Sequence, residues 1–105
     1  MSVQLLTSEF VQGKNLQHLG LVQGSVVRTK HIGNDWIASF RSIIGGEIPE
    51  YTRLMYEARK IATDRMLEQA NHLGADAVIA LRYSTCSVMG GSSEVMAYGT
   101  AVKFV

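Results

Sequence analysis

Residues 74–105 read GADAVIALRYSTCSVMGGSSEVMAYGTAVKFV, and this stretch decides the fold class. Gly74 follows a helical pattern and can adopt the left-handed conformation that ends many helices. The uncharged run at 77–81 is typical of a strand that is covered on both faces. Gly90 and Gly91 allow the positive φ angles of a hairpin turn. A second strand should therefore follow this turn and run to the C-terminus.

The last strand is apolar on both faces. Alternate residues of a strand share a face. One face of this strand carries Val95, Ala97, Gly99, Ala101 and Lys103. The other face carries Met96, Tyr98, Thr100, Val102 and Phe104. Glycine inside a strand costs about 0.5–1 kcal/mol relative to alanine. At Gly99 we therefore expect either a bulge or a neighbouring backbone that is too close for a Cβ atom.

Two further strands are predicted near the N-terminus, over Val3–Thr7 and Leu21–Thr29. Gly24 lies inside the second of them and predicts a bulge or a close approach of another backbone. Residues 12–15 have the composition of a turn, and the leucine spacing within residues 16–19 suggests one short helical turn.

The middle of the chain predicts two helices, one from about 35 to 44 and a longer one from Pro49 to Leu73. Proline suits the first position of a helix. One apolar stripe on the long helix consists of Tyr51, Leu54, Met55, Ala58, Ile61, Ala62, Met66 and Leu73. The order β-β-α-α-β-β predicts a single α+β domain over residues 1–105. In this two-layer sandwich the long helix lies on one face of a mainly antiparallel sheet.

Composition excludes several classes of protein. The formal net charge of +1 over 105 residues gives no reason to expect binding to nucleic acid or to an anionic membrane. No apolar run approaches the roughly 20 residues that cross a bilayer, and the N-terminus does not resemble a signal peptide. The single cysteine cannot form an internal disulfide. A cytoplasmic location is therefore expected.

The predicted domain has more apolar surface than one helix can cover. Tyr56, Thr63 and Leu67 form a line on the back of the long helix, and the last strand is apolar on both sides. Two explanations are open. The first helix and the chain termini could cover this surface, or the chain could associate with itself, since large apolar patches usually mark interfaces.

Several motifs resemble the YbjQ-like family, which is labelled "putative heavy-metal-binding" and is otherwise uncharacterised. The matching motifs are LGLVQG at 19–24, GGEIP at 45–49, Tyr51, Ala58-Arg59, Ala62, Met66, GADAV at 74–78, Glu94-Val95 and AYGTAV at 97–102. The resemblance implies a dodecin-subunit-like fold that assembles into a ring, commonly a pentamer. It implies no established catalytic residues.

Metal binding rests on Cys86 and Met89, which are three residues apart on the predicted turn. A soft transition metal needs at least two converging Cys, Met or His ligands, and the chain has no Cys-x-x-Cys or His-x-x-x-His motif. A ring could complete the site by bringing one Cys86 from each subunit to a common axis. The alternative is an inert thiol, with the methionines filling the core.

Catalysis has less support, because Cys86 has no base near it in the sequence and the glycines match no phosphate-binding motif. Arg65 is unusual in lying on the apolar stripe, where it could extend to solvent or pair with a carboxylate across a subunit interface. The leading hypothesis is a ring-forming scaffold or small-ligand-binding module whose partner is itself. A metal-binding protein comes second and an unrecognised enzyme third.

Overall fold

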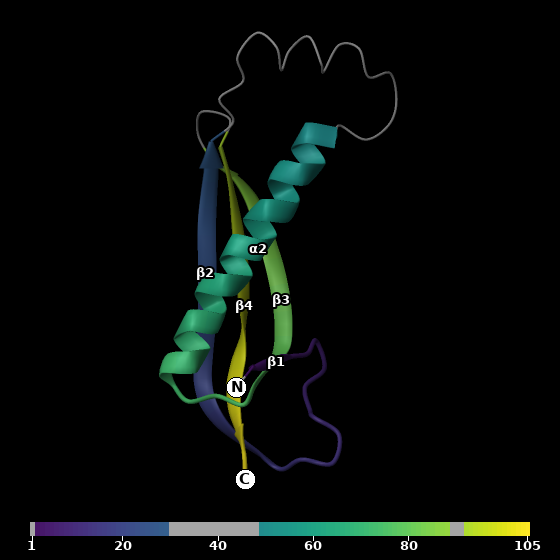
Figure 1. The fold of residues 1–105 in the computed structure, drawn as a ribbon, viewed down its shortest axis with the longest axis vertical. Coiled ribbons are helices and arrows are strands. Elements are labelled where there is room, and N and C mark those ends of the chain that lie inside the picture. The colour runs from purple at the N-terminus through teal and green to yellow at the C-terminus, as the bar shows by residue number, and fades with distance from the viewer. Residues whose placement is uncertain (1, 30–48, 89–91) are drawn as a thin grey trace, which may run out of the picture.

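The computed structural model describes residues 2–29, 49–88 and 92–105. Its elements are β1 (Gln4–Leu5), β2 (Leu16–Thr29), α2 (Pro49–His72), β3 (Ala77–Val88) and β4 (Ser92–Phe104). The strands form one sheet in the order β1-β3-β4-β2, and α2 crosses one face of it diagonally (Figure 1). β1 pairs parallel with β3, and the other pairs are antiparallel. The predicted α+β class is confirmed, with a mixed sheet and one helix packed against it.

The long helix is the element that the sequence predicted best. α2 begins at Pro49, as predicted, and ends at His72, one residue early. Gly74 follows with a φ of 72°, which is the left-handed conformation expected there. Within the described ranges, no helix combines the length and hydropathy needed to span a bilayer.

The short helical turn predicted at residues 16–19 is wrong. Leu16 begins β2 and pairs with Phe104, and the register shifts between His18 and Gly20. The long ladder with β4 outweighs the weak local preference for a turn of helix. The predicted helix at 35–44 and the Gly90-Gly91 turn lie outside the described residues, although Val88 and Ser92 on either side of that turn do pair.

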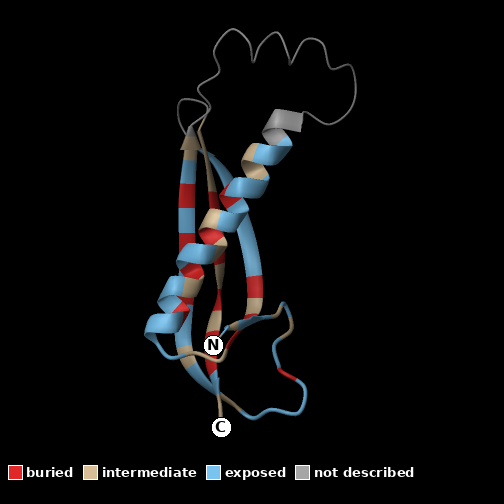
Figure 2. Ribbon diagram, in the orientation of Figure 1, coloured by how far each residue is buried: buried red, intermediate tan, exposed pale blue. Residues whose placement is uncertain are grey.

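The main core lies between α2 and the sheet (Figure 2). Its buried members are Val22, Val26, Ala58, Ala62, Met66, Ala70, Val78, Leu81, Val95, Ala97 and Ala101. The helix contributes three alanines and one methionine to this set, so most of its buried side chains are small. Small side chains allow a helix to approach a sheet closely.

A second core lies on the other face of the sheet, which we call the open face because α2 does not cover it. Here Val11, Ala77, Ile79 and Val102 are buried. The N-terminal segment covers them, with Leu6 packed alongside. The prediction that the strand beginning at Ala77 is covered on both faces is thus confirmed for its first three residues.

β3 has a bulge just after this buried part. The register with β4 shifts between Ile79 and Arg82, and Ala80 has a φ of 53°. The backbone amides of Ala80 and Leu81 both turn away from β4 and donate to the carbonyl oxygens of Ser8 and Leu6, at 2.8 and 3.0 Å. These two bonds hold the N-terminal segment over the open face.

Gly24 and Gly99 both lie where another backbone comes close. A Cβ atom at Gly24 would overlap the carbonyl oxygen of Ala62 and the amide nitrogen of Met66. At Gly99 it would lie 2.6 Å from a methyl carbon of Val78 and 2.9 Å from the carbonyl oxygen of Ile79. The sequence-based expectation of close approach is confirmed at both glycines, and Gly99 also faces the β3 bulge.

We predict that Gly24→Ala lowers the free energy of unfolding by about 2–3 kcal/mol, because the helix backbone must move away from β2 to admit a methyl group. Urea denaturation followed by circular dichroism measures the change. Ser25→Ala, at the exposed neighbouring position, is the matched control and should change stability little. Unchanged stability of the Gly24 variant would show that the close contact between Gly24 and the backbone of α2 does not contribute to stability.

Gly99→Val should also destabilise the protein, by about 1–3 kcal/mol, although valine is the better strand former. The added side chain would collide with Val78 at the bulge. Thermal unfolding and sizing chromatography with light scattering report stability and subunit number, with Thr100→Val as the control on the same strand. If the variant keeps its full melting temperature and subunit number, Gly99 has no role in packing.

Candidate ligand-binding site

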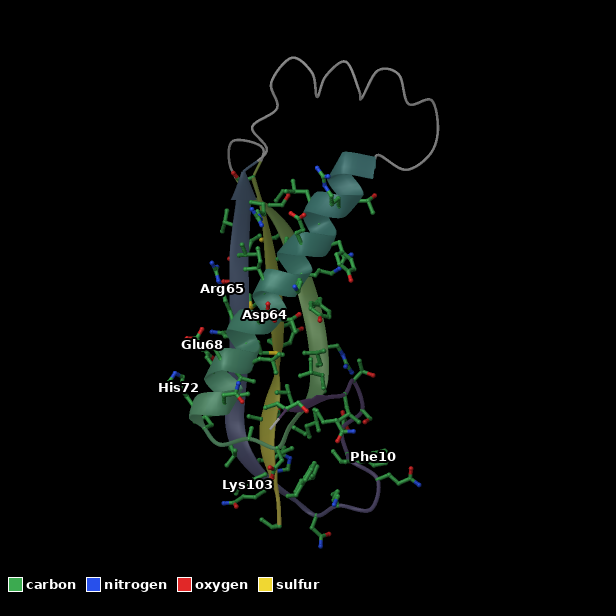
Figure 3. All side chains as sticks on the ribbon, in the orientation of Figure 1. Phe10, Asp64, Arg65, Glu68, His72 and Lys103 are labelled. Atoms are coloured by element: carbon green, nitrogen blue, oxygen red, sulfur yellow. The ribbon has the colours of Figure 1, made fainter. Side chains whose placement is uncertain are left out.

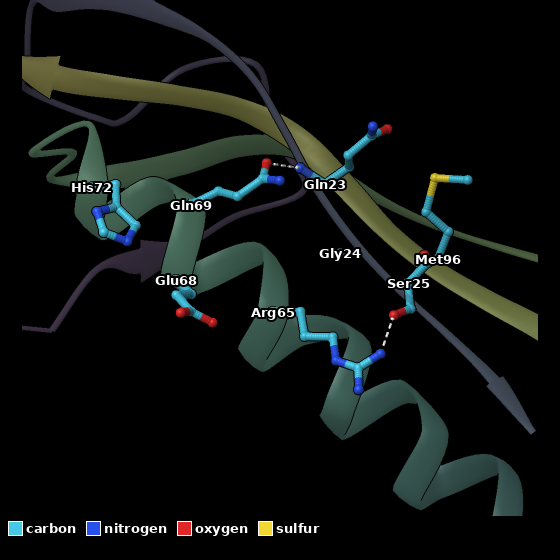
Figure 4. Close-up of a pocket in the computed structure, with 8 residues that line it drawn as sticks. All are labelled: Gln23, Gly24, Ser25, Arg65, Glu68, Gln69, His72 and Met96. Atoms are coloured by element: carbon cyan, nitrogen blue, oxygen red, sulfur yellow. Dashed lines mark hydrogen bonds between the residues drawn. The ribbon is translucent and has the colours of Figure 1, made fainter.

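A cavity lies beside the outer edge of β2, where α2 passes over it (Figure 4). Its volume is about 520 Å³. The lining residues are Gln23, Gly24, Ser25, Arg65, Glu68, Gln69, His72 and Met96. One of them is Gly24, where the helix backbone lies directly against the strand.

Two helix side chains bind the backbone of β2 in this cavity. The amide of Gln23 donates to the side-chain oxygen of Gln69 at 3.0 Å. The guanidinium of Arg65 donates to the carbonyl oxygen of Ser25 at 2.7 Å, and Figure 4 shows both bonds. The outer edge of β2 is therefore closed at its middle by hydrogen bonds from the helix.

The remaining polar groups of the cavity come from the same side of α2. Glu68 and His72 are four residues apart and so lie on one helix face, and both are exposed (Figure 3). Together with Arg65 they offer a carboxylate, an imidazole and a guanidinium within one concave site. This donor and acceptor set suits a small polar ligand, because a few placed polar groups fix a ligand's orientation in a pocket.

Arg65 and Gln69 are candidate site residues that the sequence did not identify as part of a site. The one available signal was the unusual place of Arg65 on an apolar stripe. In the structure the arginine is exposed and donates to the Ser25 carbonyl oxygen of its own chain. This contact depends on where α2 lies on the sheet. The sequence pattern alone does not give that placement.

The predicted metal ligands lie elsewhere. Cys86 is exposed and lies within β3 rather than on the predicted turn, because β3 continues to Val88 in register with β4. Its thiol donates to the carboxylate of Glu94 at 3.8 Å. Met89 lies outside the described residues. Met96 shares the face of Cys86 and Glu94, since Ser84, two residues from Cys86, is its cross-strand partner.

The part of the chain that the structure describes contains no group of three or more His, Cys, Asp or Glu side chains that could hold a metal ion. A metal site on this face would therefore need ligands beyond these described side chains. Cys86, Glu94 and Met96 are the residues that could contribute a thiolate, a carboxylate and a thioether to it.

Comparison with known proteins places the chain in a family. The family model described as "Putative heavy-metal-binding" matches residues 3–105. A UPF0145 protein of Thermus thermophilus is 51% identical over 104 residues, covering 98% of this chain and 91% of its own length. A UPF0145 protein of Vibrio parahaemolyticus is 52% identical over 100 residues, covering 94% and 95%.

A solved structure has the same fold. It is a protein of unknown function from Pediococcus pentosaceus that belongs to the DUF74 family. The TM-score is 0.64 with 18% sequence identity, and the match covers 98% of both chains. This likeness supports the arrangement of helix and sheet and carries no information about activity.

Proposed function

The chain belongs to the YbjQ family, and within that family we propose that it is a ring-forming cytoplasmic scaffold or small-ligand-binding module rather than an enzyme. The observation that carries the proposal is apolar surface that stays exposed on the described part of the chain. On the open face, Leu21 is 66% exposed and Val27 is 55% exposed. On the helix side, Tyr56 of α2 is 66% exposed and Tyr83 of β3 is 46% exposed. Apolar surface of this kind on a small domain favours contact with another subunit.

The cavity beside β2 supports the ligand-binding part of the proposal. Arg65 and Gln69 are held in place by their bonds to the strand backbone, so two of its walls are ordered before a ligand arrives. Preorganised polar groups lower the entropic cost of binding. A small polar molecule is the ligand class that this lining favours.

We predict a closed homo-oligomer, and we expect five subunits from the family resemblance. Sizing chromatography with light scattering should give several times the chain mass of 11.5 kDa. Native mass spectrometry of protein purified without an affinity tag should give the subunit number and any retained small molecule. A mass of one chain at micromolar concentration would overturn the proposal.

A heavy-metal-binding protein is the second candidate, because Cys86 is exposed beside Glu94 and the family description names this function. The site would be shared between subunits, with Cys86 and Met89 repeated around a common axis. Each ion would then take ligands from several copies, and the assembled protein would bind fewer ions than chains.

Titration of the assembled protein with Cu(I) or Zn(II) tests this candidate. We predict that Cys86→Ser removes any substoichiometric binding, since the thiolate is the strongest soft ligand on this face. Ser87→Ala is the matched control on the same strand and should bind as the wild type does. Equal binding by wild type and Cys86→Ser would eliminate the thiol as a ligand.

A further inference from the structure

Two helix side chains bind the middle of the outer edge of β2, and each keeps hydrogen-bond donors that this contact does not use. The side-chain oxygen of Gln69 accepts from the amide of Gln23 at 3.0 Å. Because a backbone amide can only donate, the oxygen of Gln69 faces the strand, and both N–H groups of this side chain remain free of that bond. The guanidinium of Arg65 binds the carbonyl oxygen of Ser25 through Nη1 at 2.7 Å. Its other N–H donors have no partner among the described residues.

The strand edge between these two bonds offers a backbone donor and a backbone acceptor. In an antiparallel pair, the amide and carbonyl of one residue point to the same side, and the sides alternate along the strand. The amide of Gln23 and the carbonyl of Ser25 bind helix side chains, so the carbonyl of Gln23 and the amide of Ser25 also face outward. Gly24 lies between them and has no side chain. Figure 4 shows Arg65 and Gln69 reaching the strand on either side of it.

The cavity contains two opposite charges that are not paired with each other. Glu68 lies three residues after Arg65, on the same face of α2, and both side chains are exposed. Among the described residues, no ion pair joins these two side chains, and the carboxylate of Glu68 has no partner. Arg65 binds the strand, which holds its positive charge at the edge of β2. The negative charge of Glu68 stays free to bind a ligand.

This arrangement fits a small molecule that carries both an ammonium and a carboxylate. The Cβ atoms of residues three apart on a helix are about 5–6 Å from each other, and the two charged groups of an α-amino acid can bridge side chains at that spacing. A carboxylate beside Arg65 would accept from its guanidinium, from the amide of Ser25 and from the N–H groups of Gln69. The ammonium would then lie beside the carboxylate of Glu68 and the carbonyl oxygen of Gln23.

Other classes of ligand fit the cavity less well. A phosphate or a dicarboxylate would meet the like charge of Glu68, and a polyamine would meet the like charge of Arg65. A neutral ligand would cover both charged groups without pairing them, which costs free energy. The volume of about 520 Å³ leaves room for the side chain of an amino acid. Met96 lines the cavity and offers that side chain an apolar contact.

We propose that the cavity beside β2 binds a free α-amino acid, with its carboxylate against Arg65 and its ammonium against Glu68. This rests on the proposed small-ligand-binding function and names the ligand class for that same site. The bonds of Arg65 and Gln69 to the strand set the positions of the anion-binding donors before the ligand arrives. The unpaired carboxylate of Glu68 then selects molecules that also carry a positive charge.

Thermal-shift measurements and calorimetry on the full chain, with each standard L-amino acid in turn, test the proposal. We expect at least one amino acid to bind and to raise the melting temperature. Its N-acetyl derivative lacks the ammonium and its methyl ester lacks the carboxylate. Each derivative should bind about tenfold or more weakly, because each loses a charge-assisted contact. Failure of every standard L-amino acid to bind, or equal binding of both derivatives, would overturn the proposal.

Two variants assign the charges of the ligand to residues. Glu68→Gln keeps the size of the side chain and breaks no bond among the described residues, so it should fold as the wild type does. It should bind the amino acid about tenfold or more weakly and should no longer favour it over the N-acetyl derivative. Arg65→Gln should lose the preference over the methyl ester. Glu57→Gln removes an exposed carboxylate of the same helix outside the cavity and should bind as the wild type does. Unchanged preferences in both cavity variants would overturn the proposal.

Two results distinguish failure of the amino-acid class from failure of ligand binding itself. If a derivative with one charge binds as tightly as its parent, and Arg65→Gln abolishes that binding, the amino-acid class is overturned and a small-ligand site remains. If calorimetry with the amino acids and both derivatives detects no binding, and native mass spectrometry of untagged protein finds no retained small molecule, the ligand-binding function is overturned as well. The scaffold function would then be the part of the proposed function that remains.

Discussion

The close contact between two backbones at Gly24 determines how α2 lies on the sheet. With no side chain at this position, the helix backbone at Ala62 and Met66 rests directly against β2. A helix seated over an outer strand must leave the far side of the sheet uncovered. In this protein α2 packs mainly on β2 and β4 and leaves β3 largely free of it. β2 and β3 therefore differ, because α2 packs closely on β2 and contacts β3 little.

The N-terminal segment covers the open face over only part of the length of the sheet. The bulge at Ala80 directs two successive amides toward Ser8 and Leu6, and this segment covers the lower part of the open face. A positive φ at a non-glycine residue costs of order 1 kcal/mol or more, which these two hydrogen bonds and the burial of Val11 offset. In the upper part of the same face, Val27 is exposed, and no described residue covers it as the N-terminal segment covers Val11.

Sequence reasoning succeeded where the determining signal is local. Pro49 and Gly74 delimit α2, and the glycines within strands correctly indicated crowded backbones. It failed at residues 16–19 and at Cys86, because both belong to strands whose extent is set by pairing with β4. The bonds from Arg65 and Gln69 to β2 depend on helix placement, so no pattern in the chain could have supplied them.

The placement of Cys86 connects the two candidate functions. The thiol follows Thr85 directly along β3, on the face that also carries Glu94 and Met96. Among the described residues of one chain, a carboxylate and a thioether lie on the same face as this thiol. In the proposed homo-oligomer, side chains of a neighbouring subunit would complete the ligand set around the thiol. Metal binding at Cys86 would then be a property of the assembly. The cavity beside β2 is separated from Cys86 by β4, so it would remain available to a small ligand.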